Sequence, residues 1–453
     1  MRLLSLAQVR KLSILMLATA IGIHAEPVKA DRISDLEDQV RLLQESLSRI
    51  QVQLQAERGQ PAPRSPNTTV STATSSAAQS THPTNTAAPA SPEAQEQPAW
   101  PKGYIPVPGT STAVKFGGAI RAEVWDDVQS TQGGRTDDAT AIPARGTAKA
   151  NRNGALNGSI SGSRFNFGTL SHTEIGDMKS FLEFDLGTDA SPTFRLRHAY
   201  IANADWLAGQ TWSTFMDMDS LPDLLSAGGS VGYSWLRRPQ VRYSIQTGDR
   251  DKLDMAAEVP TSDYSAPSAI NTAPDLVLKY TAGQSWGHYA LGGMVRYLRS
   301  DTGTGDKADQ IVWGFLGGVS IKTFGDDILT LQTVDGTGVG GALNQGTGLS
   351  AAVVNRSFQT FDAFGGSLAY KHYWNPKLRS TLAVGYDQFA NASRNIGTNG
   401  LGIRSLASVH GNIVYSPIAP MDVGIEYGYE AFTASPTGTG TASRVLGVVK
   451  YGY

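Results

Sequence analysis

The chain has 453 residues, of which 40% are hydrophobic and 49 are glycine, and its formal net charge is −2. This balance indicates no nucleic-acid partner, and the absence of cysteine excludes disulfides, thiolate metal sites and cysteine nucleophiles. The mean hydropathy of −0.22 and the lack of a long apolar run after residue 25 argue against membrane-spanning helices. Barrel strands escape this test, because each shows lipid only every second residue.

Residues 1–25 have the pattern of a secretory signal peptide. Basic residues precede an apolar run from Leu12 to Ile23, and the small residue Ala25 follows. An inner-membrane anchor would need a longer apolar run. We therefore expect export, with cleavage after Ala25 or, alternatively, after Ala30.

Residues 31–58 predict a coiled coil. From Ile33 to Leu54 the apolar residues are spaced alternately three and four apart, which is the seam of a heptad repeat. The seam mixes branched and unbranched residues, and Arg32 and Glu37 are similar in spacing to the Arg and Glu of short trimeric coiled coils. We expect three chains. The alternative is a single amphipathic helix lying on its own barrel.

Residues 59–102 form a linker that is rich in Pro, Ser, Thr and Ala and has almost no large apolar side chains. Such a composition cannot build a core. A flexible tether of about forty residues has a mean reach of about 35 Å. The helix is therefore expected in the periplasm, well below the following domain, with peptidoglycan as its candidate contact.

Residues 103–453 alternate between apolar and polar residues and predict an all-β domain. In the final strand Val449 and Tyr451 alternate with Lys450 and Gly452, which fits a wall between lipid and water. The sixteen candidate strands span residues 113–125, 163–170, 178–186, 193–202, 206–212, 239–246, 252–259, 274–281, 287–298, 310–323, 327–334, 361–373, 377–387, 404–415, 421–430 and 443–453. Fourteen or eighteen strands, or a soluble sandwich, are the alternatives.

The connections between these strands alternate between short and long. Turns such as 203–205 and 325–326 are short, whereas 126–162, 212–238 and 334–360 are long. Outer-membrane barrels sort their connections in this way, and aromatic residues at the strand ends fit their interface girdles. We therefore predict a 16-stranded antiparallel transmembrane β-barrel of porin type, which is wide enough to leave an aqueous channel.

The third long loop, between Trp212 and Trp235, is too apolar for a free external loop. We expect it to fold into the barrel, with its apolar residues against the inner wall. Its acidic residues Asp217, Asp219 and Asp223 are then expected to face the channel water.

Several arginines fall on the inferred inward faces of the strands. Lumen-facing arginines concentrate anions and bind carboxylates in bidentate pairs. The alternative is that they pair with acidic residues of neighbouring strands and only support the wall. The candidate constriction residues are Arg121, Arg195, Arg197, Arg237, Arg238, Arg242 and Arg296; Arg164 also falls on an inward face, and Lys279, Arg379 and Lys450 lie elsewhere.

With these residues in view, the chain resembles the DcaP-like trimeric outer-membrane porins over nearly its whole mature length. The most specific stretches are 104–109, 114–118, 194–200, 207–213 and 235–243. The resemblance implies a homotrimer with one pore per subunit. It also implies passive uptake of small negatively charged solutes, such as dicarboxylates.

Two other classes of function remain in competition with a channel. Catalysis is disfavoured, because the histidines fall on different predicted strands and no Gly-x-Ser-x-Gly elbow accompanies them. No metal-ligand spacing or cofactor motif is found, so we expect neither a metal nor a cofactor. The second alternative is an outer-membrane adhesin or cell-wall tether whose barrel is plugged.

Overall fold

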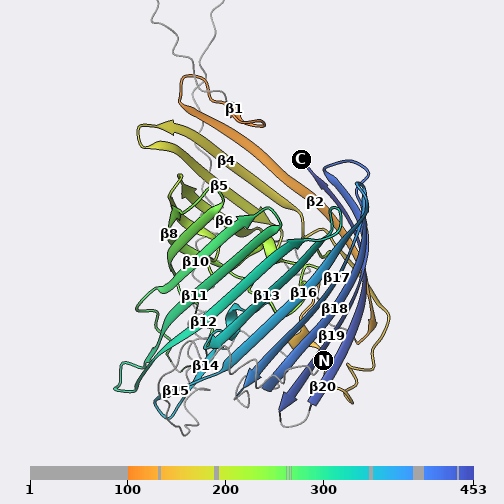
Figure 1. Ribbon diagram of the computed structural model, residues 1–453. Coiled ribbons are helices and arrows are strands. Elements are labelled where there is room, and N and C mark those ends of the chain that lie inside the picture. The colour runs from red at the N-terminus through yellow and green to blue at the C-terminus, as the bar shows by residue number, and fades with distance from the viewer. Residues whose placement is uncertain are drawn as a thin grey trace, which may run out of the picture. The chain divides into compact units, whose positions relative to one another are not determined.

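The computed structural model describes residues 100–130, 134–187, 193–261, 263–264, 266, 268–345, 350–390, 402–435 and 438–453 (Figure 1). The predicted signal peptide, the coiled coil and nearly all of the linker lie outside these residues, so they remain predictions. The described residues fold as one unit. Among them, no helix is long and apolar enough to cross a membrane.

Sixteen antiparallel strands close into a barrel, as the alternation predicted. Each strand pairs with the next, and the last pairs with the first, with Lys450 opposite Arg121. A closed barrel leaves no unpaired edge in lipid, so the soluble sandwich is wrong. The strands are β2 (Thr112–Gln129), β4 (Arg164–Thr173), β5 (Gly176–Asp185), β6 (Arg195–Ala202), β7 (Trp206–Trp212), β8 (Arg237–Gln246), β9 (Asp251–Glu258), β10 (Asp275–Gln284), β11 (Gly287–Asp301), β12 (Lys307–Lys322), β13 (Ile328–Thr337), β16 (Asp362–Asn375), β17 (Leu378–Ala390), β18 (Gly402–Tyr415), β19 (Met421–Ser435) and β20 (Gly438–Gly452).

Shorter elements accompany the barrel. β3 (Ala155–Ser159) pairs with the end of β2 that β4 does not reach, so two successive segments complete one side of that strand. A hairpin of two further strands pairs only with itself. The remaining elements are β1 (Ile105–Pro106), the hairpin strands β14 (Ala351–Val354) and β15 (Ser357–Thr360), and the 3-10 turns η1 (Ala139–Ala141), η2 (Met218–Ser220) and η3 (Gly340–Ala342).

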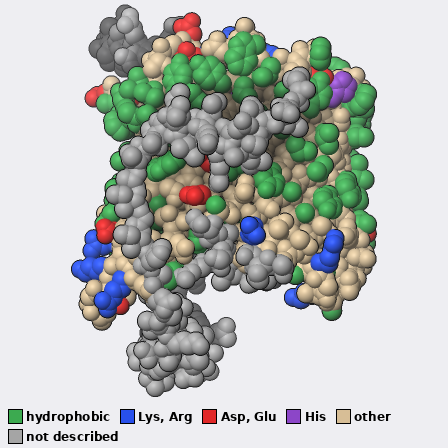
Figure 2. Space-filling model, turned by 60° about the horizontal axis from the view of Figure 1, so that its bottom comes forward, with side chains coloured by type: hydrophobic (Ala, Val, Ile, Leu, Met, Phe, Trp, Pro, Cys, Tyr) green, Lys and Arg blue, Asp and Glu red, His purple; other side chains and the backbone are tan. Residues whose placement is uncertain are grey.

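The outer face of the wall is apolar at every second residue. On β11 Leu291 and Val295 are 60% and 49% exposed, whereas Met294 between them is 2% exposed. β12 repeats the pattern with Ile311 and Phe315. Figure 2 shows hydrophobic side chains spread over the wall. This period of two follows from the pleat and gives the barrel a surface suited to lipid.

The long connections gather at one end of the barrel, as predicted. Turns such as 203–205 and 376–377 are short, and residues 130–163, 213–236 and 338–361 form long connections at the opposite end. This is the arrangement of outer-membrane barrels, whose short turns face the periplasm.

Loops pack against the inside of the barrel in three apolar clusters. In the largest cluster, Phe215 and Leu343 from the loops meet Leu316 and Val334 from the wall. In the second, Phe358 of β15 packs with Leu298 and Val312 of the wall, and in the third Leu225 packs with wall residues such as Val414. The wall residues of the largest cluster come from β9 to β13 and from β16 to β20.

Candidate pore constriction

Residues 213–236, here called the constriction loop, enter the lumen after β7. Phe215 and Met216 are buried against the wall at 0% and 1% exposure. Lys279 of β10 donates from Nζ to the Met216 carbonyl at 2.7 Å, and Gln332 of β13 donates from Nε2 to the Asp217 carbonyl at 3.0 Å. The apolar side chains therefore anchor the loop, as the sequence predicted, and wall side chains bind its backbone.

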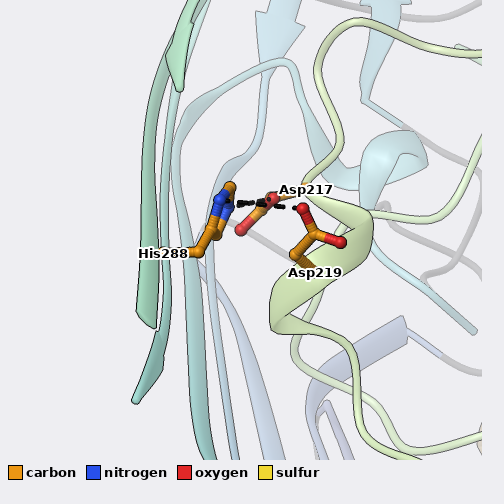
Figure 3. A group of neighbouring side chains, drawn as sticks. All are labelled: Asp217, Asp219 and His288. Atoms are coloured by element: carbon orange, nitrogen blue, oxygen red, sulfur yellow. Dashed lines mark hydrogen bonds and ion pairs between the residues drawn. The ribbon is translucent and has the colours of Figure 1, made fainter. Parts of the chain in front are cut away.

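His288 of β11 lies between two carboxylates of the first turn of the constriction loop (Figure 3). Its Nε2 lies 2.8 Å from Oδ1 of Asp217, and its Nδ1 lies 3.6 Å from Oδ2 of Asp219. Burial alone would raise the pKa of Asp217, but the hydrogen bonds from His288 and Ser220 and the nearby charges of His288 and Lys279 together outweigh it, so the net pKa lies below its usual value. An imidazolium can donate from both nitrogens, so it fits between two carboxylates.

The same three side chains are spaced as a metal site would be. Their candidate ligand atoms all lie within 4.8 Å of one another. Both ring nitrogens of His288 already face carboxylates, however, and the ammonium of Lys279 lies close to Asp217. This arrangement favours an ion-paired histidine over a bound cation.

The second half of the loop is tied to the opposite part of the wall. Arg379 of β17 donates from Nε to Oδ2 of Asp223 at 2.9 Å, and Asn412 of β18 donates to the Asp223 carbonyl at 2.9 Å. Glu426 of β19 accepts from the backbone N–H groups of Leu225 and Ser226. These contacts hold the loop across the barrel rather than along a single strand.

Two glycines let the loop backbone touch the wall. Gly232 has φ +97°, and a Cβ there would overlap the backbone carbonyl of Gly366 on β16. On β17, a Cβ at Gly385 would overlap the carbonyl oxygen of Val231. A side chain at either position would push the loop inward.

A cavity of about 630 Å³ lies between the constriction loop and wall residues of β2, β4, β5, β6, β8, β19 and β20. Loop residues such as Leu224, Ser226 and Trp235 line one side. Basic groups outnumber acidic ones: the basic lining residues are Arg121, Arg135, Arg164, Arg195, Arg197, Arg237 and Lys450, and the acidic ones are Glu183, Asp185 and Asp422. Such a lining creates a positive local potential.

Some of these arginines are already paired with acids. Arg195 binds Asp185 through Nε and Nη2 at 2.9 and 2.6 Å. Arg197 binds Glu183 at 2.8 Å and Asp185 at 2.7 Å. Both acceptors lie on the adjacent β5, so these guanidinium groups hold two strands together and their charge is largely compensated.

Arg121 and Arg135 are compensated in the same manner, because both pair with Glu123 of β2. Arg135 Nη2 lies 2.9 Å from the Glu123 Oε1. The carboxylate is 3% exposed. Burial of an acid between two arginines fixes their positions at the edge of the cavity.

Other basic residues of the cavity keep their charge available. Arg164 approaches Glu183 only to 3.8 Å and donates no hydrogen bond to any residue that the structure describes. Arg237 forms no ion pair within the described ranges, and its guanidinium carbon lies 5.0 Å from the ring centroid of Trp212. Lys450 likewise has no ion pair among the described side chains.

The sequence model of the DcaP outer membrane protein family matches residues 97–453. The chain belongs to this family. It is therefore an outer-membrane protein of the channel and porin class. A comparison with curated protein sequences gives no match.

Solved structures share the fold with this DcaP-family chain. The outer membrane channel DcaP of Acinetobacter baumannii has 22% identity and a TM-score of 0.67, covering 76% of this chain and 98% of the other. OmpT of Vibrio cholerae has 14% identity and a TM-score of 0.50, covering 77% and 99%. In-vitro folded OmpT in a trimer form also has 14% identity and a TM-score of 0.50, covering 76% and 100%.

The predicted constriction arginines of this DcaP-family chain fall into three groups. Arg121, Arg195, Arg197 and Arg237 line the cavity. Arg238 and Arg296 are each 2% exposed and share Asp275, which lies 3.7 and 3.0 Å from them. Arg242 lies on the inner face of β8 outside the cavity lining.

The predicted acidic residues of the loop are also separated. Asp217 is 3% exposed and binds the wall through His288, so it does not face water as expected. Asp223 pairs with Arg379 and, at 3.6 Å, with Lys371. Asp219 alone of the three has a largely exposed side chain. Asp217 and Asp223 therefore anchor the loop, because each pairs with a basic side chain of the wall, His288 or Arg379.

Two features of the site were not predicted from the sequence. Arg135 lies in a long loop without strand periodicity, so no pattern points to it. His198 follows Arg197, and both are buried, because a register shift between β5 and β6 breaks the alternation there. A bulge places two successive side chains on one face, which a strict period of two cannot predict.

Proposed function

We propose that this protein is a porin that passively admits small negatively charged solutes, dicarboxylates and similar organic anions, through an arginine-lined constriction. The observation that carries the proposal is the excess of basic over acidic side chains around the cavity beside the constriction loop. Arg164 and Arg237 contribute to this excess, and neither has a hydrogen-bonded acid in the part of the chain that the structure describes.

Electrostatics favours anions at such a constriction. A positive potential raises the local concentration of anions, and guanidinium groups bind carboxylates with two parallel hydrogen bonds. Arginine keeps its charge over the physiological pH range. Selectivity for anions is therefore expected to be nearly independent of pH around neutrality.

We further propose that three chains assemble in the outer membrane, each with its own pore. The trimer form of in-vitro folded OmpT, which shares the fold, supports three-fold assembly. The heptad pattern of residues 31–58 supports a trimeric coiled coil in the periplasm, after removal of residues 1–25. Peptidoglycan is the proposed contact of this coiled coil.

One observation favours the alternative of a plugged barrel that serves as an adhesin or cell-wall tether. Loop residues fill the inner face of much of the barrel, with Phe215, Leu343 and Phe358 all buried there. The cavity of about 630 Å³ beside the loop argues for an open path instead.

Reconstitution separates the two functions. The purified mature protein is placed in planar bilayers under a KCl gradient, and the zero-current potential is measured. We expect open channels whose zero-current potential has the sign that chloride permeation produces. A cation-selective potential would overturn anion uptake, and a silent protein would support the tether. Liposome swelling with succinate, against uncharged and cationic solutes of similar size, then tests the substrate class.

A further inference from the structure

We propose that Arg237, assisted by Arg164, is the residue that binds the carboxylate group of a passing anion, and that Arg195 and Arg197 serve as structural supports in the same cavity. This inference rests on the proposed function and deepens it. It divides arginines that the sequence could only treat as a set.

The supporting arginines are already bound to internal carboxylates. Arg195 places two nitrogens on Asp185, and Arg197 places one nitrogen on Glu183 and another on the same Asp185. Arg197 is 4% exposed. A solute carboxylate that binds either of them must share a guanidinium whose charge an internal carboxylate already compensates, which offsets part of the gain in binding.

Arg237 differs because its guanidinium has no protein acceptor among the described residues. Its Nη1 is enclosed and lacks a hydrogen-bond partner. A buried donor without an acceptor is unfavourable, and a ligand oxygen or water that reaches the group relieves this cost. Arg237 lines the cavity, so a solute in transit can approach it.

Aromatic side chains set the orientation of Arg237. The guanidinium lies over Trp212, which is its register partner on β7, at 5.0 Å from the ring centroid. Trp235 of the constriction loop lies 4.5 Å from Trp212, centroid to centroid. Stacking on a ring leaves the N–H edge of a guanidinium free, and this edge is the part that binds carboxylates.

Arg164 adds a second free guanidinium from β4. Its side chain is 46% exposed, and its closest acid, Glu183, is 3.8 Å away. Arg164, Arg195 and Arg197 all act electrostatically on Arg237. An anion that enters the cavity relieves the repulsion between Arg237 and these like charges. Arg237 and Arg164 together therefore attract a carboxylate more strongly than either residue alone.

A charge-matched comparison tests the division. Arg237→Gln and Arg195→Gln each remove one positive charge from the same cavity. Chloride current is recorded in bilayers while succinate is added, and the concentration that reduces the current by half is measured. We expect this concentration to rise about tenfold in Arg237→Gln, because one charge-assisted contact is lost. In Arg195→Gln it should change by less than about threefold, as expected for a change of field alone.

Two further variants distinguish loss of carboxylate binding from misfolding of the channel. Arg237→Lys keeps the charge but loses the flat stacked group, so it should weaken succinate block while leaving the zero-current potential unchanged. Arg164→Gln should also raise the half-blocking concentration, by less than Arg237→Gln. Equal effects of Arg237→Gln and Arg195→Gln in a channel that remains anion-selective would overturn this inference and leave the proposed function intact. A wild-type channel that is silent or cation-selective would instead overturn the proposed function.

Discussion

Nε2 of His288, on the barrel wall, lies 2.8 Å from Oδ1 of Asp217, on the constriction loop. The two residues are 71 positions apart in sequence. The carbonyl groups of Met216 and Asp217 also accept hydrogen bonds, from Lys279 and Gln332 respectively. Together these contacts determine where the loop begins to cross the lumen. Loop placement therefore depends on a few polar contacts at its first turn.

We expect Asp217→Asn to destabilise the protein at neutral pH. The pKa of Asp217 lies below its usual value, so ionisation of this group stabilises the fold above about pH 4. That contribution is lost as the pH falls through the lowered pKa. The loss at pH 7 should be about 1–3 kcal/mol, measured by urea unfolding in detergent.

The difference between Asp217→Asn and wild type should then shrink as the pH is lowered below about 4, since the wild-type carboxyl becomes neutral too. Asp219→Asn is the matched control, because Asp219 is exposed and lies 3.6 Å from the ring. A difference that stays constant from neutral to acidic pH would contradict the role of the charge.

Gly232→Ala should narrow the channel. A Cβ at this position overlaps the Gly366 carbonyl, and the positive φ adds strain of about 1–2 kcal/mol. The loop must move away from the wall, toward the open side of the lumen. Single-channel conductance should fall, whereas Gly411→Ala, where a Cβ makes only an ordinary contact, should leave it unchanged. Wild-type conductance in Gly232→Ala would contradict the close packing.

Asp185→Asn should increase the preference for anions. The carboxylate compensates both Arg195 and Arg197, so its removal leaves their charge exposed to the cavity. The chloride-to-potassium permeability ratio should rise, the opposite direction from Arg237→Gln. A lower ratio would show that the arginines depend on Asp185 for their position rather than being masked by it.

Arg296→Gln should affect stability rather than selectivity. Arg296 is 2% exposed and binds Asp263 at 2.7 Å and Asp275 at 3.0 Å. Removal of the guanidinium leaves Asp263 and Asp275 without their cationic partner. For a buried ion pair this lowers the free energy of unfolding by about 3–5 kcal/mol. Unfolding in urea measures this loss, and Arg296→Lys should recover part of it. A shifted zero-current potential would place Arg296 in the ion path instead.

The fold could be predicted from sequence because lipid and water face opposite sides of one wall. The alternation of Leu291 and Val295 with buried Met294 is forced by the pleat, so each strand carries its own signal. Closure follows, since hydrocarbon does not tolerate a free edge. β3 was missed, because it is a five-residue segment that completes the pairing of β2 and has no pattern of its own.

The site was less predictable, because its chemistry depends on which side chains meet. Arg237 and Arg238 are neighbours in sequence, yet one lines the cavity and the other is buried beside Asp275. Composition cannot separate them, because both are arginines at the start of the same strand. The pairing of Asp217 with His288 likewise requires the path of the loop, which local periodicity does not encode.

The constriction loop and Arg237 adjoin in the chain, since the loop ends at residue 236 and β8 begins with Arg237. A rearrangement that widened the passage would thus carry the free guanidinium away from its place over Trp212. We therefore expect throughput and discrimination to be linked: a mutant selected for faster entry of bulky nutrients or antibiotics should also become less selective for charge.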